Sequence, residues 1–174
     1  MEKNNITPIS LIITGVAVIG FAALFISAKK QQDIAVTPAA DTTPSSLCYV
    51  LNKNGDTAFL KLTTTDGGLT ITGDLATYPA QKDSMKGTLS GVATNVDGDA
   101  VFDGQYANSA EGMNNISEQL IKLDPTQAQI GYGEMVEAAD GTYDYKDKTK
   151  VTYSLTLPAV DCTQYDSLKT AAGH

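Results

Sequence analysis

The chain has 174 residues and a formal net charge of −8 at pH 7, and all 12 of its basic residues are lysines. This length fits one domain of ordinary size beside a shorter segment, and it excludes a large multidomain enzyme. Nucleic-acid binding relies on the release of counterions from phosphates and on the bidentate guanidinium of arginine. An acidic chain without arginine is therefore predicted to bind no nucleic acid.

Residues 1–30 contain an uncharged apolar run from Ile9 to Ala28, ISLIITGVAVIGFAALFISA. A helix of about 20 apolar residues spans the roughly 30 Å hydrocarbon core of a bilayer. A cleaved signal peptide is the alternative, but its apolar region has only about 7–15 residues and ends at a small-x-small site. Cleavage after Ala28 would place Ile26 at the −3 position. We therefore predict an uncleaved membrane anchor over 1–30 that contacts the lipid bilayer through residues 9–28.

Three further segments follow the anchor. Residues 31–47, QQDIAVTPAADTTPSSL, are rich in Thr, Pro, Ala and Ser without a periodic apolar face, which is typical of a flexible linker. Residues 48–162 are predicted to form the folded domain. Residues 163–174 form a tail that is frayed or folds as a short helix.

The two cysteines, Cys48 and Cys162, bracket this domain. Their placement predicts a disulfide that joins the first and last strands; two unrelated buried thiols are the alternative. A persistent disulfide needs an oxidising compartment. Lys3 on one flank of the anchor nearly balances Lys29 and Lys30 on the other, so loop charge does not fix the orientation. The cysteine pair therefore places the domain outside the cytoplasmic membrane, in the periplasm or at the cell surface.

Between the cysteines, apolar residues alternate with polar ones, as in half-buried strands. Turn signals with glycine or proline, such as Asn54-Gly55 and Asp97-Gly98, separate the alternating runs. The predicted strands are Cys48–Asn52, Thr57–Thr64, Leu69–Tyr78, Lys86–Thr94, Ala100–Asn108, Asn115–Leu123, Ala128–Glu137 and Thr149–Leu157.

Eight strands joined by hairpins, without a helical crossover, predict an all-β fold. We expect an antiparallel up-and-down barrel or a curled meander, since closure removes exposed strand edges; a two-sheet sandwich is the alternative. One segment is ambiguous, because Ile116, Leu120 and Leu123 would also share a helical face. Its neighbours favour the strand.

The sequence offers no catalytic constellation and no cofactor site. The single histidine, His174, is the last residue of the chain, where a free terminus would not hold a catalytic ring in place. Two separated cysteines without an internal histidine fall short of a zinc site. The stretch Gly131-Tyr132-Gly133 lacks the third glycine and the following helix of a phosphate-binding loop.

Acidic loops raise the question of a cation site. Residues 95–99, NVDGD, resemble part of a calcium loop, but Ala93 and Gly104 would then stand where carboxylates are required. A hairpin turn is the preferred interpretation. A solvated acidic loop is also preferred over a weak cation site for Asp140, Asp144 and Asp147.

Carboxylates on the predicted strands and turns could pair inside a barrel as general acid and base. The candidates are Asp103, Glu111, Glu118 and Glu134. Because Asp and Glu are rarely buried without a partner, we prefer to place them on the surface. We therefore predict no catalytic residue, no metal site and no enzymatic activity.

Between Cys48 and Glu137 a set of short motifs recurs at turns and strands: Cys48-Tyr49, Asn54-Gly55-Asp56-Thr57, Thr72-Gly73-Asp74-Leu75, Tyr78, Lys82-Asp83, Gly87-Thr88, Gly91, Ser109, Glu111-Gly112 and Gly131-Tyr132-Gly133-Glu134. With these motifs, residues 48–137 resemble a group of small β-domain proteins of the bacterial envelope, often lipoproteins, from Bacteroidota-like lineages. The lipid-acceptor cysteine that such proteins often carry is missing here. The resemblance implies an envelope location and a small β domain, and no activity.

Two functional hypotheses follow. In the first, the barrel binds a small ligand or an envelope component inside or at its mouth, because barrels of this size can hold one small molecule. In the alternative, the domain is a structural or interaction module of an envelope complex without a ligand pocket, and it presents an exposed patch instead. The side chains expected to face a ligand are Tyr78, Phe102, Tyr106, Tyr132 and Glu134.

Overall fold

The computed structural model describes residues 44–174. The predicted anchor, residues 1–30, and most of the predicted linker lie outside the described residues. Within residues 44–174, no helix is long and apolar enough to cross a bilayer.

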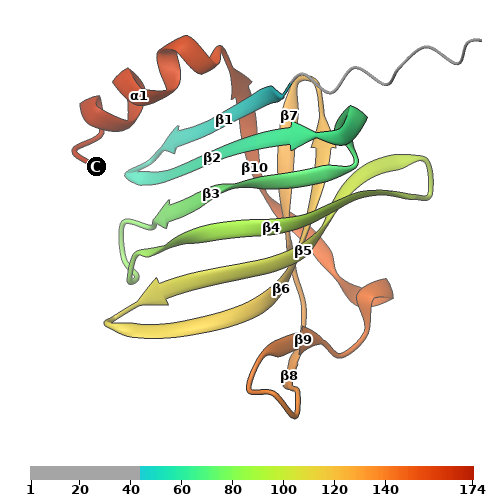
Figure 1. Ribbon diagram of the computed structural model, residues 1–174. Helices are drawn as coiled ribbons and strands as arrows, with labels where there is room; N and C mark the ends of the chain where they lie inside the picture. The colour runs from blue at the N-terminus through green and yellow to red at the C-terminus, as the bar shows by residue number, and fades with distance from the viewer. Residues whose placement is uncertain (1–43) are drawn as a thin grey trace, which may run out of the picture. The chain divides into compact units, whose positions relative to one another are not determined.

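Eight antiparallel strands close into a barrel, as the sequence predicted (Figure 1). Each strand from β1 to β6 pairs with the strand that follows it, and β10 pairs with both β7 and β1. The barrel strands are β1 (Ser45–Lys53), β2 (Asp56–Thr65), β3 (Thr70–Tyr78), β4 (Met85–Val96), β5 (Asp99–Ala110), β6 (Met113–Asp124), β7 (Gln127–Tyr132) and β10 (Thr152–Val160). The strand interpretation of the ambiguous segment is therefore confirmed, since it forms β6.

The predicted seventh strand is split in the structure. It ends as β7 at Tyr132, and the chain resumes as the short strand β8 (Met135–Glu137), which pairs with β9 (Tyr143–Tyr145). A single parallel bridge, between Ser117 and Tyr143, connects β9 to β6. The link from β7 to β10 is therefore not the simple hairpin that the sequence suggested. It contains the β8–β9 hairpin and a short 3-10 helix, η2 (Lys148–Lys150). A second 3-10 helix, η1 (Asp66–Gly68), lies between β2 and β3.

Tight turns connect the long strands at both ends of the barrel. Asn54-Gly55, Asp97-Gly98 and Glu111-Gly112 each have positive φ at both residues, as two-residue hairpin turns of type I′ require. The Asn95 side chain accepts a hydrogen bond from the Gly98 N–H at 3.1 Å. The preferred interpretation of residues 95–99 as a hairpin turn is thus confirmed.

Glycines permit the sharp curl of β4 against β5. Gly91 lies opposite Gly104, and a Cβ atom on either residue would lie 2.6 Å from the Cα of the other. No larger residue fits both positions without separating the strands. The six strands β1–β6 can therefore wrap around the core as one continuous sheet.

The inward face of the barrel carries the main apolar core. Its buried members are Tyr49, Ala58, Leu60, Leu62, Ile71, Leu75, Leu89, Phe102, Tyr106, Ile121, Ala128, Ile130 and Leu157. A smaller cluster lies on the outer face, where the helix α1 (Cys162–Ala171) covers β1 and β2. Tyr165 of α1 meets the edge of Phe59 with ring centroids 6.0 Å apart. The predicted tail is therefore a helix that belongs to the domain.

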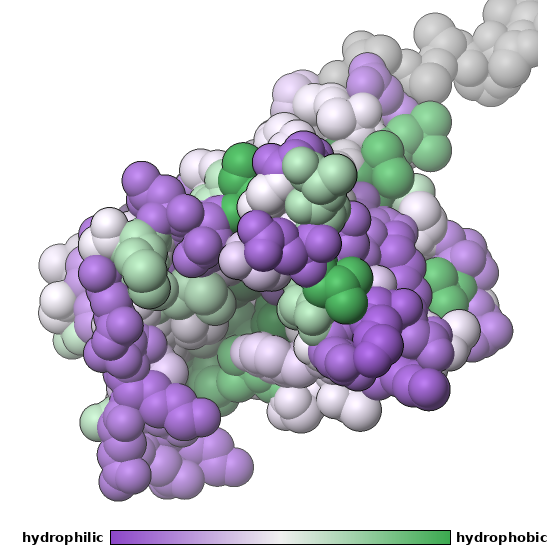
Figure 2. All heavy atoms as spheres, turned by 90° about the horizontal axis from the view of Figure 1, so that it is seen from below, coloured by the Kyte–Doolittle hydropathy of each residue, from purple (hydrophilic) through white to green (hydrophobic). Residues whose placement is uncertain are grey.

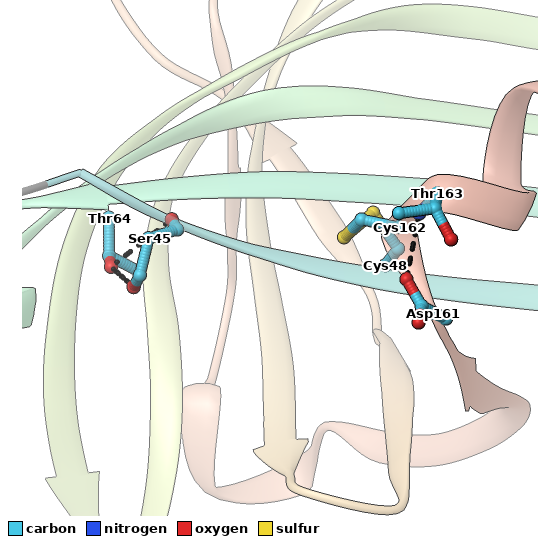
Figure 3. The surroundings of a disulfide bond; sticks show 6 residues. All are labelled: Ser45, Cys48, Thr64, Asp161, Cys162 and Thr163. Atoms are coloured by element: carbon cyan, nitrogen blue, oxygen red, sulfur yellow. Dashed lines mark hydrogen bonds between the residues drawn. A yellow bond between two sulfur atoms is a disulfide. The ribbon is translucent and has the colours of Figure 1, made fainter.

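The predicted disulfide between Cys48 and Cys162 is present, with Cα atoms 5.2 Å apart (Figure 3). Cys48 lies on β1, as expected. Cys162 is the first residue of α1 and not part of the last strand, because β10 ends at Val160. Asp161 caps the helix by accepting a hydrogen bond from the Thr163 N–H at 2.8 Å, which aims Cys162 back at β1.

The barrel closes through two short seams. β1 and β10 share only the pairs Cys48–Val160 and Tyr49–Ala159. β6 and β7 share four residue pairs, whereas β5 and β6 share eleven. Figure 1 shows the reason: β7 and β10 run across the direction of β1–β5, so the strands meet over a short length and then diverge.

An Asp-x-Thr pattern recurs at four turns and caps. In each, the carboxylate accepts hydrogen bonds from the side chain and the backbone N–H of the threonine two residues later, and these contacts lower the pKa of the carboxyl. The four carboxylates are Asp124, Asp140, Asp147 and Asp161. A carboxyl with a lowered folded-state pKa stabilises the fold above its unfolded pKa of about 3.9, and this contribution is lost as the pH falls through the folded value.

We expect the midpoint of thermal unfolding to fall as the pH is lowered from 5 to 2, and a variant with all four aspartates changed to Asn to show a smaller fall. The pKa of Glu111 is shifted in the opposite direction, because a hydrogen bond with Asp83 and the charge of Asp83 raise it. Glu111→Gln is therefore the matched control and should not reduce the acid effect. An equal fall in the parent and in the fourfold variant would contradict this account.

Candidate binding site at the open end of the barrel

One end of the barrel interior is packed, and the other is hollow. The end that carries the turns after β4 and β6 is filled by apolar side chains such as Phe102 and Ile121. Towards the opposite end, both seams have separated. The β6–β7 ladder does not extend beyond Ile121–Ile130, and the β1–β10 ladder does not extend beyond Tyr49–Ala159. The open end is therefore a consequence of the same crossing that makes the seams short.

Two cavities lie at this open end, and Tyr132 lines both. The first has a volume of about 420 Å³ and lies beside β1, β2 and the loop after β3; it is lined by Leu51, Asn54, Asp56, Thr57, Ala58, Thr77, Pro79, Ala80, Gln81, Lys82, Tyr132 and Leu155. The second has about 440 Å³ and lies between β6 and the β8–β9 hairpin; it is lined by Met85, Asn108, Asn115, Ser117, Glu118, Gln119, Gly131, Tyr132, Gly133, Met135, Tyr143 and Tyr145. We call these the β1-side cavity and the β6-side cavity. Figure 2, seen from below Figure 1, shows a hollow with apolar atoms at its floor and hydrophilic residues around it.

Tyr132, the last residue of β7, stands between the two cavities. Its side chain is 44% exposed although the neighbouring Ile130 is buried in the core. Partial burial raises the pKa of its phenol. A half-exposed aromatic ring at the mouth of an apolar interior is a typical contact for a small ligand.

Gln119 bridges the gap where β6 and β7 separate. Its amide nitrogen donates to the Leu120 carbonyl at 3.0 Å and to the Gly131 carbonyl at 3.1 Å. The Tyr145 hydroxyl also donates to Gly131, at 2.9 Å. These side chains replace the ladder hydrogen bonds that the diverging strands no longer make, so they hold the wall of the β6-side cavity in place.

The same amide presents an acceptor to the cavity. Gln119 is only 7% exposed, and its side-chain oxygen has no hydrogen-bond partner among residues 44–174. Asn108 is similar: it is 8% exposed, its nitrogen donates to the Tyr106 carbonyl at 3.2 Å, and its oxygen has no partner in that range. Both residues line the β6-side cavity, which therefore holds two free amide acceptors.

A charged cluster borders the β6-side cavity on the outer face of the barrel. Lys148 lies 2.7 Å from Glu118 and 2.8 Å from Asp103. Burial lowers the pKa of Lys148, but its hydrogen bonds to the two carboxylates outweigh burial and raise it. Glu118 also accepts a hydrogen bond from the Tyr145 N–H at 3.1 Å. The cluster thus combines two carboxylates with one ammonium group.

The aromatic residues expected to face a ligand fall in three places. Phe102 and Tyr106 lie inside the barrel, but both are fully buried in the packed core, where the Tyr106 hydroxyl donates to the Leu75 carbonyl at 2.8 Å. Tyr132 lines both cavities. The interior position expected for Tyr78 is wrong, because residue 78 shares the outward face of β3 with Ala76.

Glu134 and His174 also lie away from the cavities. Glu134 is exposed and pairs with Lys146 at 2.8 Å. The expectation that His174 is loose at the end of the chain is wrong. Its ring stacks on Tyr78 with centroids 3.5 Å apart and shares a hydrogen bond of 3.1 Å with the Thr57 hydroxyl. Its ring therefore helps to hold the end of the chain against the outer face of the barrel.

The candidate carboxylates do not form an acid and base pair inside the barrel. Asp103 and Glu118 meet on the outer face through Lys148, and Glu111 lies beside Asp83 in the turn region. Within residues 44–174, no group of three His, Cys, Asp or Glu side chains is arranged to hold a metal ion.

Sequence reasoning missed several lining residues, namely Gln119, Met135, Tyr143 and Tyr145. One signal was present in β6. Its inward positions are polar at Asn115, Ser117 and Gln119 and become apolar at Ile121 and Leu123. Such a change along one face of a strand indicates that the barrel interior passes from a wet end to a dry core.

Comparison of the chain with protein-family models, with curated proteins and with solved structures gives no match. The function is therefore inferred from the geometry of the site.

We expect Gln119→Leu to lower the free energy of unfolding by about 1–3 kcal/mol, because the Leu120 and Gly131 carbonyls lose a buried donor. Urea unfolding followed by circular dichroism measures this change. Gln105→Leu, on the exposed outer face of β5, is the control and should change stability by less than about 0.5 kcal/mol. Equal effects of the two variants would show that Gln119 does not support the seam.

Proposed function

We propose that this protein is a membrane-tethered, extracytoplasmic binding protein that takes a small amphipathic ligand at the open end of its barrel. The observation that carries the proposal is the pair of cavities on either side of Tyr132, in a barrel whose opposite end is packed. Apolar floors and polar rims of this kind are typical of small-molecule sites.

The lining chemistry supports binding more than catalysis. No histidine or cysteine lines either cavity in the described part of the chain. Glu118, the carboxylate of the β6-side cavity, is already held by Lys148 and the Tyr145 N–H. A general base or nucleophile would need a free group with a partner that activates it.

The proposed location combines the sequence with one feature of the fold. The apolar run Ile9–Ala28 would anchor the chain in the bilayer, and the domain that follows would lie outside the cytoplasm. The Cys48–Cys162 disulfide supports the orientation, since such bridges are rare in a reducing cytosol.

A tryptophan placed at the site tests the proposal, because the chain contains none. In the full-length Tyr132→Trp variant, a panel of neutral, cationic and anionic small amphiphiles should include members that change the fluorescence saturably. Ser117→Leu in the same background fills the β6-side cavity and should weaken the response of ligands bound there by about tenfold. Ser90→Leu, on the exposed outer face of β4, is the matched control and should leave it unchanged. A panel without any saturable response would overturn the proposal.

An outer groove favours the alternative function, an interaction module of an envelope complex. It has a volume of about 690 Å³ and lies over the outer faces of β3–β6 beside α1, with Ala76, Tyr78, Ala107, Ile116 and Lys169 among its lining residues. Ile116 is 42% exposed there. If this groove docks a partner protein, crosslinking in native membranes should give an adduct that Ile116→Glu abolishes and that Val136→Glu, at an exposed position of β8, retains.

A further inference from the structure

We propose that the ligand of the β6-side cavity is a small organic ammonium ion, held by tyrosine rings and amide oxygens. This inference rests on the proposed binding function and names the chemical class of its ligand.

The aromatic lining is the first argument. Tyr132, Tyr143 and Tyr145 all border the β6-side cavity, together with Met85 and Met135. Tyrosine rings attract cations through the negative charge on their faces, and polarisable thioethers pack well against alkyl groups. None of these three rings stacks on another aromatic ring or on a lysine among residues 44–174. Tyr145 is only 9% exposed and packs against Val101 and Leu120, so the ring faces left for a ligand are those of Tyr132 and Tyr143.

The buried amides are the second argument. Gln119 and Asn108 are each more than nine-tenths buried, and their nitrogens donate to backbone carbonyls. Since the nitrogens face carbonyl groups, the orientation of both amides is fixed, and their oxygens remain as acceptors for a group inside the cavity. Among residues 44–174 no buried side-chain nitrogen or oxygen lacks a partner, so these two oxygens are open to solvent in the cavity; an ammonium ion, or the hydroxyl or amide hydrogens near one, would replace water as their donor.

Charge is the third argument. The β6-side cavity has no lysine in its lining, and the bordering cluster of Asp103, Glu118 and Lys148 has one more carboxylate than ammonium group. The β1-side cavity includes Lys82, and the outer groove includes Lys86 and Lys169. Of these three hollows, the β6-side cavity is thus the one with chemistry suited to a cation. The net charge of −8 adds attraction at longer range.

The test compares choline with its neutral isostere, 3,3-dimethylbutan-1-ol, on the full-length protein by saturation-transfer difference NMR. The two probes have nearly the same shape and differ in charge, so any preference reports the cation. We expect choline to bind saturably and the alcohol at least about tenfold more weakly. Tyr132→Leu should weaken choline binding by about the same factor, whereas Tyr132→Phe, which keeps the ring, should retain it. Tyr153→Leu, at a half-buried tyrosine that lines neither cavity, is the matched control and should bind choline as the parent does.

The outcomes separate this inference from the proposed function. Equal binding of the two probes, or binding of anionic amphiphiles in preference to choline, would overturn the ammonium assignment and leave a ligand-binding barrel. Retention of choline binding in Tyr132→Leu would also overturn it, because the site would then lie elsewhere. If neither these probes nor the amphiphile panel bind, both the inference and the proposed function fail.

Discussion

The seam between β1 and β10 closes the barrel with two residue pairs and one disulfide. The other neighbours in the barrel are consecutive strands joined by hairpins, apart from β7 and β10, between which the β8–β9 hairpin is inserted. Closing this seam brings residues 114 positions apart into contact, at a high cost in chain entropy. In the chain-entropy model, a disulfide across such a long loop offsets about 4–5 kcal/mol of that cost. The bridge also fixes α1 over Phe59, so the outer apolar cluster depends on the same contact.

The geometry that makes the seams short also creates the site. Because β7 and β10 cross the six-stranded sheet, they pair with β6 and β1 only near one end and leave space at the other. Gln119 and Tyr145 satisfy the backbone carbonyls exposed by this divergence. Side chains that support the fold therefore form one wall of the cavity, and the proposed ligand would contact groups that the barrel already holds in position.

Local signals in the sequence were sufficient for the barrel and for the disulfide. Alternation of apolar residues and Asn-Gly or Asp-Gly turns depend on neighbouring residues only, so seven of the predicted strands recur with shifted ends, and the eighth, residues 128–137, is broken after Tyr132. Contacts between distant segments were not predictable in this way. The β8–β9 hairpin meets β6 through one bridge, and its tyrosines reach the cavity only because β6 and β7 diverge. The outward position of Tyr78 follows from alternation, because residue 78 is three positions after the inward Leu75 on a strand without a register shift; the expectation of an interior ring did not apply that period of two.

Native-state hydrogen exchange of the full-length protein, with the disulfide intact and after mild reduction, tests most directly whether the β1–β10 seam depends on the bridge. The account predicts that reduction speeds exchange of the amides of β1, β10 and α1 through local opening, while the amides of β3, β4 and β5 stay protected. Unchanged exchange at β1 and β10, or an equal acceleration in every strand, would contradict it.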